Sequence, residues 1–104
     1  MEEIWKDNEG FEGRYQISSL GRVKSFLKDT DNGVILKPMV CTNGYLRIDL
    51  RNNGRTYKLL VHRVVAEAFL PNQNHFEYVN HKDESRDNNC VDNLKWCTHK
   101  YNVN

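Results

Sequence analysis

The sequence has 104 residues, of which 38% are hydrophobic and 28% are charged, and its formal net charge is +1. This length and composition are typical of one globular domain with its own core, and no apolar run approaches the roughly 20 residues of a membrane-spanning helix. The three cysteines include no C-x-x-C pair. They favour reduced thiols in a cytoplasm and disfavour a structural zinc site.

The charge is unevenly distributed along the chain. Residues 1–13 carry five acidic side chains and one lysine, whereas residues 47–63 carry five basic side chains and one aspartate. A local basic surface can contact DNA phosphates while the whole chain stays near neutral. Positive side chains also occur on hairpins for solubility alone, so both interpretations stay open. The five basic residues are Arg47, Arg51, Arg55, Lys58 and Arg63.

The front of the chain predicts two short strands, near Tyr15–Ser18 and Arg22–Ser25, joined by a tight Ser-Leu-Gly turn. Trp5 and Tyr15 are predicted to lie in the core, since aromatic residues of a small domain are more often buried than stacked on bases. Arg22 and Lys24 are the candidates for DNA contact here. The next interval, Lys28–Pro38, is predicted to be a loop.

The clearest hairpin follows. Tyr45–Leu50 alternates apolar and polar residues, Asn52–Gly54 forms the turn, and Thr56–Val61 returns. The apolar positions of the first strand are expected to face the core. A twisted ribbon with arginines near its tip can enter a DNA groove, although an ordinary structural hairpin has the same pattern.

A short helix is predicted over His62–Phe69, because apolar residues recur at helical spacing and Pro71 prevents its continuation. His62 stands at the junction of strand and helix. A histidine in such a place more often satisfies a backbone carbonyl, and a role at a scissile phosphate is the alternative.

The last part of the chain predicts a strand over Val79–His81, a loop over Lys82–Asp92 and a strand over Leu94–Cys97. Thr98 is a plausible N-cap for a helix that follows. That helix would carry Asn102, whose side chain would face back towards His81. A base, amide ligands and a carboxylate are thus expected to meet on a strand–loop–strand–helix frame.

Several stretches resemble the HNH nuclease family, in the branch found in phage and intron homing endonucleases. They are VHRVVAEAF (Val61–Phe69), VNHKD (Val79–Asp83), NNCVDNLKW (Asn88–Trp96) and the closing Asn102. The front, IWKDNEGFEGRYQISSLGRVKS (Ile4–Ser25), resembles the module that precedes the nuclease in such proteins. The resemblance covers nearly the whole chain and implies a ββα-metal motif.

The resemblance also implies a fold. We expect an α+β chain with a small β-rich N-terminal module over residues 1–40. A hairpin, a short helix and the ββα-metal HNH region are expected over residues 41–104, packed with that module as one compact unit.

By position in the family pattern, His81 is the general base, since a neutral imidazole can take the proton of a water near physiological pH. Asn80 and Asn102 hold one divalent ion, Mg²⁺ or Mn²⁺, through oxygen. Asn93 braces the loop and the base. Asp83 is the nearest further carboxylate, and it either contributes to the metal or caps the loop.

The implied activity is metal-dependent hydrolysis of phosphodiester bonds in double-stranded DNA, leaving 5′-phosphate and 3′-hydroxyl ends. A monomer would nick one strand, and cutting both strands would need a homodimer or a second nicking event. The implied setting is the cytoplasm of a bacterial or phage-infected host cell. Two alternatives remain: a DNA-binding module with weak or no nuclease activity, and a structural or interaction domain with neither activity.

Overall fold

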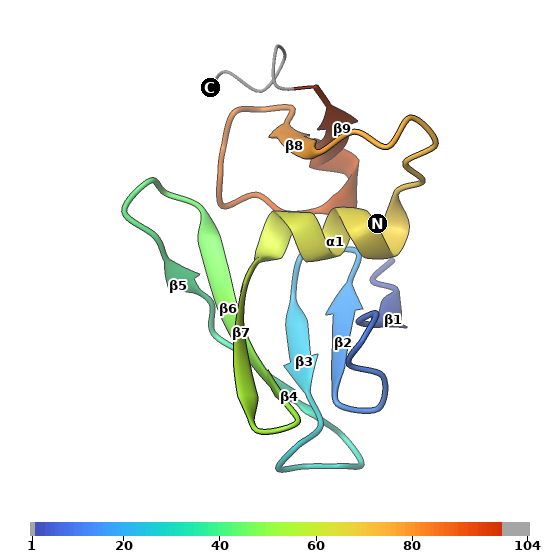
Figure 1. The fold of residues 1–104 in the computed structure, drawn as a ribbon, viewed down its shortest axis with the longest axis vertical. Helices are drawn as coiled ribbons and strands as arrows, with labels where there is room; N and C mark the ends of the chain where they lie inside the picture. The colour runs from blue at the N-terminus through green and yellow to red at the C-terminus, as the bar shows by residue number, and fades with distance from the viewer. Residues whose placement is uncertain (1, 99–104) are drawn as a thin grey trace.

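The structure is a computed structural model that describes residues 2–98, within which the chain forms three antiparallel sheets and one α-helix (Figure 1). The predicted α+β class is confirmed. The closing helix and Asn102 lie outside the described residues. The elements are β1 (Trp5–Asp7), β2 (Tyr15–Ser18), β3 (Val23–Ser25), β4 (Val34–Ile35), β5 (Met39–Val40), β6 (Leu46–Asn52), β7 (Arg55–Leu60), α1 (Val61–Phe69), β8 (Tyr78–His81), the short 3-10 helix η1 (Val91–Asn93) and β9 (Leu94–Cys97).

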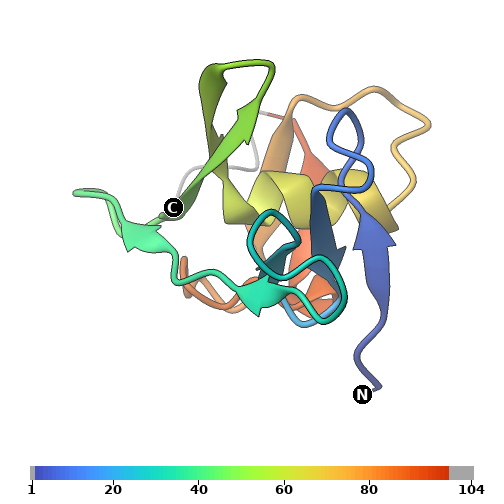
Figure 2. The same cartoon turned by 90° about the horizontal axis from the view of Figure 1, so that it is seen from below.

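The sheets are small and share one helix. Their strand orders are β1-β2-β3-β4, β5-β6-β7 and β8-β9. In Figure 1, α1 lies across the middle of the molecule, with the first two sheets below it and the β8–β9 hairpin above it. The helix contacts strands of all three sheets. Seen from below, the β6–β7 hairpin and the strands of the first sheet lie on two sides of the view, and α1 spans between them (Figure 2).

The hairpin forms as its alternation predicts. In β6, Ile48 and Leu50 are buried, and the residues between and after them, Asp49 and Arg51, are exposed. Side chains of a strand point alternately to opposite faces, so one face of the hairpin packs on the core and the other meets solvent. Asn53 and Gly54 both have positive φ, as a tight turn between two strands requires.

Helix α1 contributes much of the core. Val61, Val64, Val65 and Ala66 are at most 4% exposed. The helix ends at Phe69, where the N–H of Leu70 donates to the carbonyl of Ala66. No helix in residues 2–98 is both long and apolar enough to span a bilayer.

The sequence missed three short strands. It predicts a loop over Lys28–Pro38, but β4 pairs there with β3, and β1 and β5 also form. These strands have two or three residues, too few to display an alternating pattern. The boundary between residues 40 and 41 stays a prediction; β5 pairs with β6 across it.

The two aromatic residues predicted to be core behave differently. Tyr15 is 3% exposed, and its hydroxyl accepts a hydrogen bond from the Arg51 backbone N–H at 3.0 Å. Trp5 is only half-buried, and the Lys24 ammonium lies 4.1 Å from the centre of its ring. The prediction that Trp5 lies in the core is therefore wrong, and its ring instead contacts the cations of Arg22 and Lys24.

The packing gives a stability prediction. Leu50 is fully buried, so Leu50→Ala leaves a cavity and is expected to lower the free energy of unfolding by about 2–5 kcal/mol in urea denaturation. Val40, which is 68% exposed, is the control, and Val40→Ala is expected to change it by less than about 0.5 kcal/mol. Equal losses in the two variants would contradict the core described above.

Candidate active site and nucleic-acid interface

His81 ends β8 and is buried, with 3% of its surface exposed. Its ring nitrogen Nε2 lies 2.8 Å from Oδ1 of Asn89, which is itself 4% exposed. An amide oxygen accepts hydrogen bonds and cannot donate them, so this contact places the imidazole proton on Nε2. No described residue hydrogen-bonds Nδ1, which therefore keeps its lone pair in the neutral ring.

Two aromatic rings enclose His81. The ring of His62, from the first turn of α1, lies 5.0 Å from the His81 ring between centroids, and the Tyr45 ring lies at 5.8 Å. Tyr45 stacks on His62 at 4.9 Å, and the Arg86 guanidinium lies 4.8 Å from the Tyr45 centroid. Segments far apart in the sequence thus meet around one imidazole.

His62 lies beside His81 in the first turn of α1, and a role at a scissile phosphate stays a prediction. It was expected to satisfy a backbone carbonyl, yet no described residue hydrogen-bonds its buried Nδ1. Burial first, and then the nearby charges of His81 and Arg63, lower the pKa of His62 to about 4. The residue is therefore a neutral aromatic neighbour of His81 at physiological pH. In the sequence, only the position of His62 in the family stretch Val61–Phe69 indicated a role near the site.

Asn93 closes the loop that follows β8. Its Oδ1 accepts the Asp83 N–H at 3.0 Å, and its Nδ2 donates to Asp83 Oδ1 and to the Asn88 carbonyl, both at 2.9 Å. The Lys82 N–H donates to the Asn93 carbonyl at 2.8 Å. These contacts brace the loop, and a role of Asn93 at the base stays a prediction. The ring of His81 is instead held by Asn89.

Asp83 acts within the loop in this structure. Its carboxylate accepts hydrogen bonds from the side chains of Asn88 and Asn93 and from the Ser85 N–H. These bonds, with the Asn88 bond the largest contribution, lower the pKa of Asp83. The geometry favours the loop-capping role for Asp83 over direct metal contact, and a contribution to the metal stays a prediction.

Asn80 precedes the base on β8 and pairs with Lys95 on β9. It lines a surface hollow of about 310 Å³ together with Lys95 and Thr98. Its amide oxygen is a donor of the type that Mg²⁺ and Mn²⁺ accept, so this residue fits a metal ligand in kind. Residues 2–98 contain no group of three or more His, Cys, Asp and Glu side chains suited to a metal ion. The second predicted ligand, Asn102, lies outside these residues.

The structure separates the predicted DNA-contact residues of the hairpin into two faces. Directly opposed residues of paired strands point to the same face. One face of the hairpin therefore carries Arg47, Arg51 and Lys58, because Lys58 is paired with Asp49 on the same face of β6. Arg55 is paired with Asn52 and points to the other face. Asp49 partly neutralises the basic face through an ion pair of 3.2 Å with Arg47.

Three other predicted DNA-contact residues make internal contacts. Arg22 is paired with Glu3 and lies 5.5 Å from the Trp5 ring centroid, and Lys24 lies over the same ring. Arg63 donates to the Glu77 carbonyl. Each side chain thus has a structural partner, and contact with DNA stays a prediction for all three.

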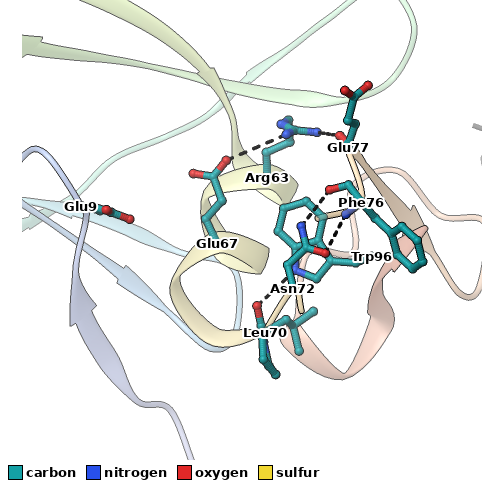
Figure 3. A pocket seen from close by; sticks show the side chains of 9 residues that line it. Glu9, Arg63, Glu67, Leu70, Asn72, Phe76, Glu77 and Trp96 are labelled. Atoms are coloured by element: carbon teal, nitrogen blue, oxygen red, sulfur yellow. Dashed lines mark hydrogen bonds and ion pairs between the residues drawn. The ribbon is translucent and has the colours of Figure 1, made fainter. Parts of the chain in front are cut away.

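Arg63 also borders a hollow of about 700 Å³ between α1 and the segment 70–77 (Figure 3). Glu9, Glu67 and Glu77 line it with Arg63 and Trp96. Three carboxylates make this hollow unsuited to a DNA phosphate, and His81 does not line it. This hollow is therefore separate from His81, whose role as the general base stays a prediction.

The buried His62 gives a pH prediction. An unfolded chain binds this proton near the ordinary pKa of 6.5, whereas the folded chain binds it only near 4. The stability contributed by neutral His62 is fully present above pH 6.5 and is lost as the pH falls towards 4. Between about pH 7.5 and about pH 4.5, the loss is expected to be about 2 kcal/mol.

Urea denaturation at these two pH values checks the expectation in wild type and in His62→Phe, which keeps an aromatic ring but cannot titrate. The difference between the two pH values is expected to shrink in His62→Phe by that amount. His75, which is exposed, supplies the matched control, and His75→Gln is expected to retain the wild-type difference. An unchanged difference in His62→Phe would contradict the assignment.

This chain is similar to several known proteins. The NUMOD4 motif matches residues 3–51. The DNA endonuclease I-HmuI of Bacillus phage SP01 is 41% identical over 99 residues, which are 95% of this chain and 55% of that protein. Two uncharacterized HNH endonucleases of Acanthamoeba polyphaga mimivirus are 38% and 34% identical, over 86% and 80% of this chain and 26% and 20% of those proteins.

A solved structure, described as DNA binding and cleavage by the HNH homing endonuclease I-HmuI, has a TM-score of 0.83 and 42% sequence identity to this chain. The match covers 99% of this chain and 56% of the I-HmuI chain, so this chain spans about half the length of I-HmuI. HNH endonucleases generally use a divalent metal ion. In its sequence and its fold, this chain is similar to HNH homing endonucleases, and a NUMOD4 motif matches its N-terminal half.

Proposed function

We propose that this chain is the catalytic part of a DNA endonuclease that hydrolyses one phosphodiester bond of a duplex at a time. The observation that carries the proposal is the buried His81, whose Nε2 is held by Asn89 and whose Nδ1 keeps its lone pair. An imidazole with one nitrogen fixed and the other available is suited to take a proton from water.

The proposed step is an in-line displacement at phosphorus. His81 removes a proton from water as the water oxygen forms a bond to phosphorus, and the bond from phosphorus to the 3′ oxygen breaks. The products carry a 5′-phosphate and, after protonation of the leaving oxygen, a 3′-hydroxyl. The scissile phosphate would lie at the end of β8, where His81 and Asn80 are neighbours in the chain.

One divalent ion, Mg²⁺ or Mn²⁺, completes the proposal. Asn80 and Asn102 would hold it through their amide oxygens, with Asp83 as a further oxygen donor. When bound, such an ion stabilises the charge that grows on the phosphate and on the leaving oxygen. Asn80 is a neutral ligand, so we expect the phosphate oxygens of the substrate to complete the binding.

The hairpin supplies the proposed DNA contact. Arg47, Arg51 and Lys58 share one exposed face of β6 and β7, and a two-stranded ribbon has dimensions that fit a major groove. We propose that this face contacts the duplex, with Arg22, Lys24, Arg55 and Arg63 as secondary contacts. A single chain with one such centre nicks one strand, in the cytoplasm of a bacterial or phage-infected cell. The homodimer gains no support from the comparisons.

A plasmid-nicking assay tests the catalytic proposal. Wild type is expected to convert supercoiled to open circular DNA with Mg²⁺ or Mn²⁺ and not with EDTA. His81→Ala is expected to lower the rate by about 10²–10⁴-fold, the usual contribution of a general base. His75→Gln, which changes an exposed histidine of the segment 70–77, is the matched control and is expected to cut at the wild-type rate.

Equal rates for wild type and His81→Ala would refute the assignment of the base. A wild-type chain that shifts DNA in a gel but cuts it under no metal condition would instead favour the alternative, a DNA-binding module with weak or no nuclease activity.

The orientation of the hairpin can be tested with two charge variants. Arg51→Gln is expected to weaken duplex binding for all sequences and to lower the slope of log K against log salt by about 0.9, the value for one lost phosphate contact. Arg55→Gln removes the same charge from the other face and is expected to have a smaller effect. A larger effect for Arg55→Gln, measured by fluorescence anisotropy, would reverse the proposed orientation.

A further inference from the structure

The loop that holds the base is itself held by the N-terminal module. The Val91 N–H donates to the Ser19 carbonyl at 2.8 Å, and the Cys90 thiol donates to the Leu20 carbonyl at 3.5 Å. Ser19 and Leu20 belong to the turn between β2 and β3, and the bonds cross about 70 residues of sequence. The turn therefore contacts the two residues that directly follow Asn89.

Gly21, in the same turn, packs directly on Asn89. A Cβ added at Gly21 would stand 2.8 Å from the backbone carbonyl of Asn89 and 2.9 Å from its Cβ, distances that real Cβ atoms essentially never show. Its φ of +88° is also in the left-handed region that favours glycine. Position 21 thus lets the turn approach Asn89 more closely than any other residue type would.

Asn89 in turn determines how His81 presents its nitrogens. Both residues are at most 4% exposed, and the 2.8 Å contact joins Asn89 Oδ1 to His81 Nε2. The rings of Tyr45 and His62 lie beside the imidazole but no described residue other than Asn89 hydrogen-bonds it. Without the Asn89 oxygen, the ring could rotate or carry its proton on Nδ1.

We propose that Asn89 is a positioning residue for His81, and that the β2–β3 turn of the NUMOD4 region, through Gly21, holds Asn89 against the base. The front module would then take part in catalysis as the support of the catalytic loop, in addition to any contact with DNA. This inference rests on the nuclease function proposed above, so its first test uses a measurement that does not require cleavage.

The first test is the tautomer of His81 in the whole chain, measured from the nitrogen chemical shifts of its ring by NMR at a pH where the ring is neutral. Wild type is expected to carry the proton on Nε2. Asn89→Ala is expected to lose this preference. A wild-type ring with its proton on Nδ1 would overturn the inference, whether or not the chain cuts DNA.

The second test is cleavage by variants of Asn89. Asn89→Ala is expected to lower kcat about 10–100-fold, the usual loss when the partner that orients a functional histidine is removed, with little change in the affinity for DNA. Asn89→Asp keeps an acceptor oxygen and is expected to restore most of kcat. Asn88→Ala removes a neighbouring amide that bonds Asp83 and not the base, and it serves as the control for general damage to the loop. Wild-type kcat in Asn89→Ala would overturn the inference.

The third test separates the contact at Gly21 from the cost of its backbone conformation. Gly21→Ala is expected to lower kcat at least as much as Asn89→Ala. Gly13 has a similar φ of +80° and no atom within 4 Å of an added Cβ, so Gly13→Ala carries the same strain without the collision. Equal kcat in the two glycine variants, each confirmed as folded by circular dichroism, would overturn the role of the turn. A wild-type chain that cuts no DNA would refute the proposed function alone, since the tautomer measurement still decides the inference.

Discussion

The structure depends on the burial of one helix. Its three sheets have two to four short strands each, and a two-stranded sheet such as β8–β9 is at best marginally stable alone in water. Each of them gains a hydrophobic partner in α1, whose Val61, Val65 and Ala66 are at most 1% exposed. The helix therefore unites a front module, a hairpin and a nuclease hairpin that lie in different parts of the sequence.

The same helix determines the surroundings of His81. Its first turn presents the neutral ring of His62 to His81, while Tyr45 enters from the segment before β6 and Asn89 from the loop after β8. An imidazole surrounded by aromatic rings and one amide oxygen has little freedom to turn. Preorganisation of this kind suits the role of general base that we propose for His81, since a displaced base loses most of its catalytic effect. Packing of the neighbouring rings restricts the His81 ring, and within residues 2–98 the hydrogen bond to Asn89 fixes its orientation.

Sequence reasoning succeeded where a local pattern was strong. The alternation of β6, the spacing of apolar residues in α1 and the strands on either side of the nuclease loop were all predicted to within a residue or two, because each pattern reports directly on which face is buried. The short strands β1, β4 and β5 were missed because their pairing depends on neighbours and not on their own residues. Contacts at long range were missed for the same reason: neither the His62 ring beside His81 nor the Asn89 bond to its Nε2 leaves a local signal. The role of Asn93 in closing the loop was anticipated from the family pattern, and the structure gives it the hydrogen bonds to do so.

The close approach of Gly21 to Asn89 has a consequence for how such proteins can be recombined. Modules that are joined only by a linker can be exchanged freely, because neither depends on the shape of the other. Here the β2–β3 turn of the front module contacts the loop after β8 through two hydrogen bonds. At Gly21 the turn lies so close to Asn89 that no side chain would fit. A chimera that replaced residues 3–51 with an unrelated DNA-binding module would lose the contact between Gly21 and Asn89 and the two hydrogen bonds to Cys90 and Val91. We therefore expect that an engineered chimera must take the two regions together from the same protein.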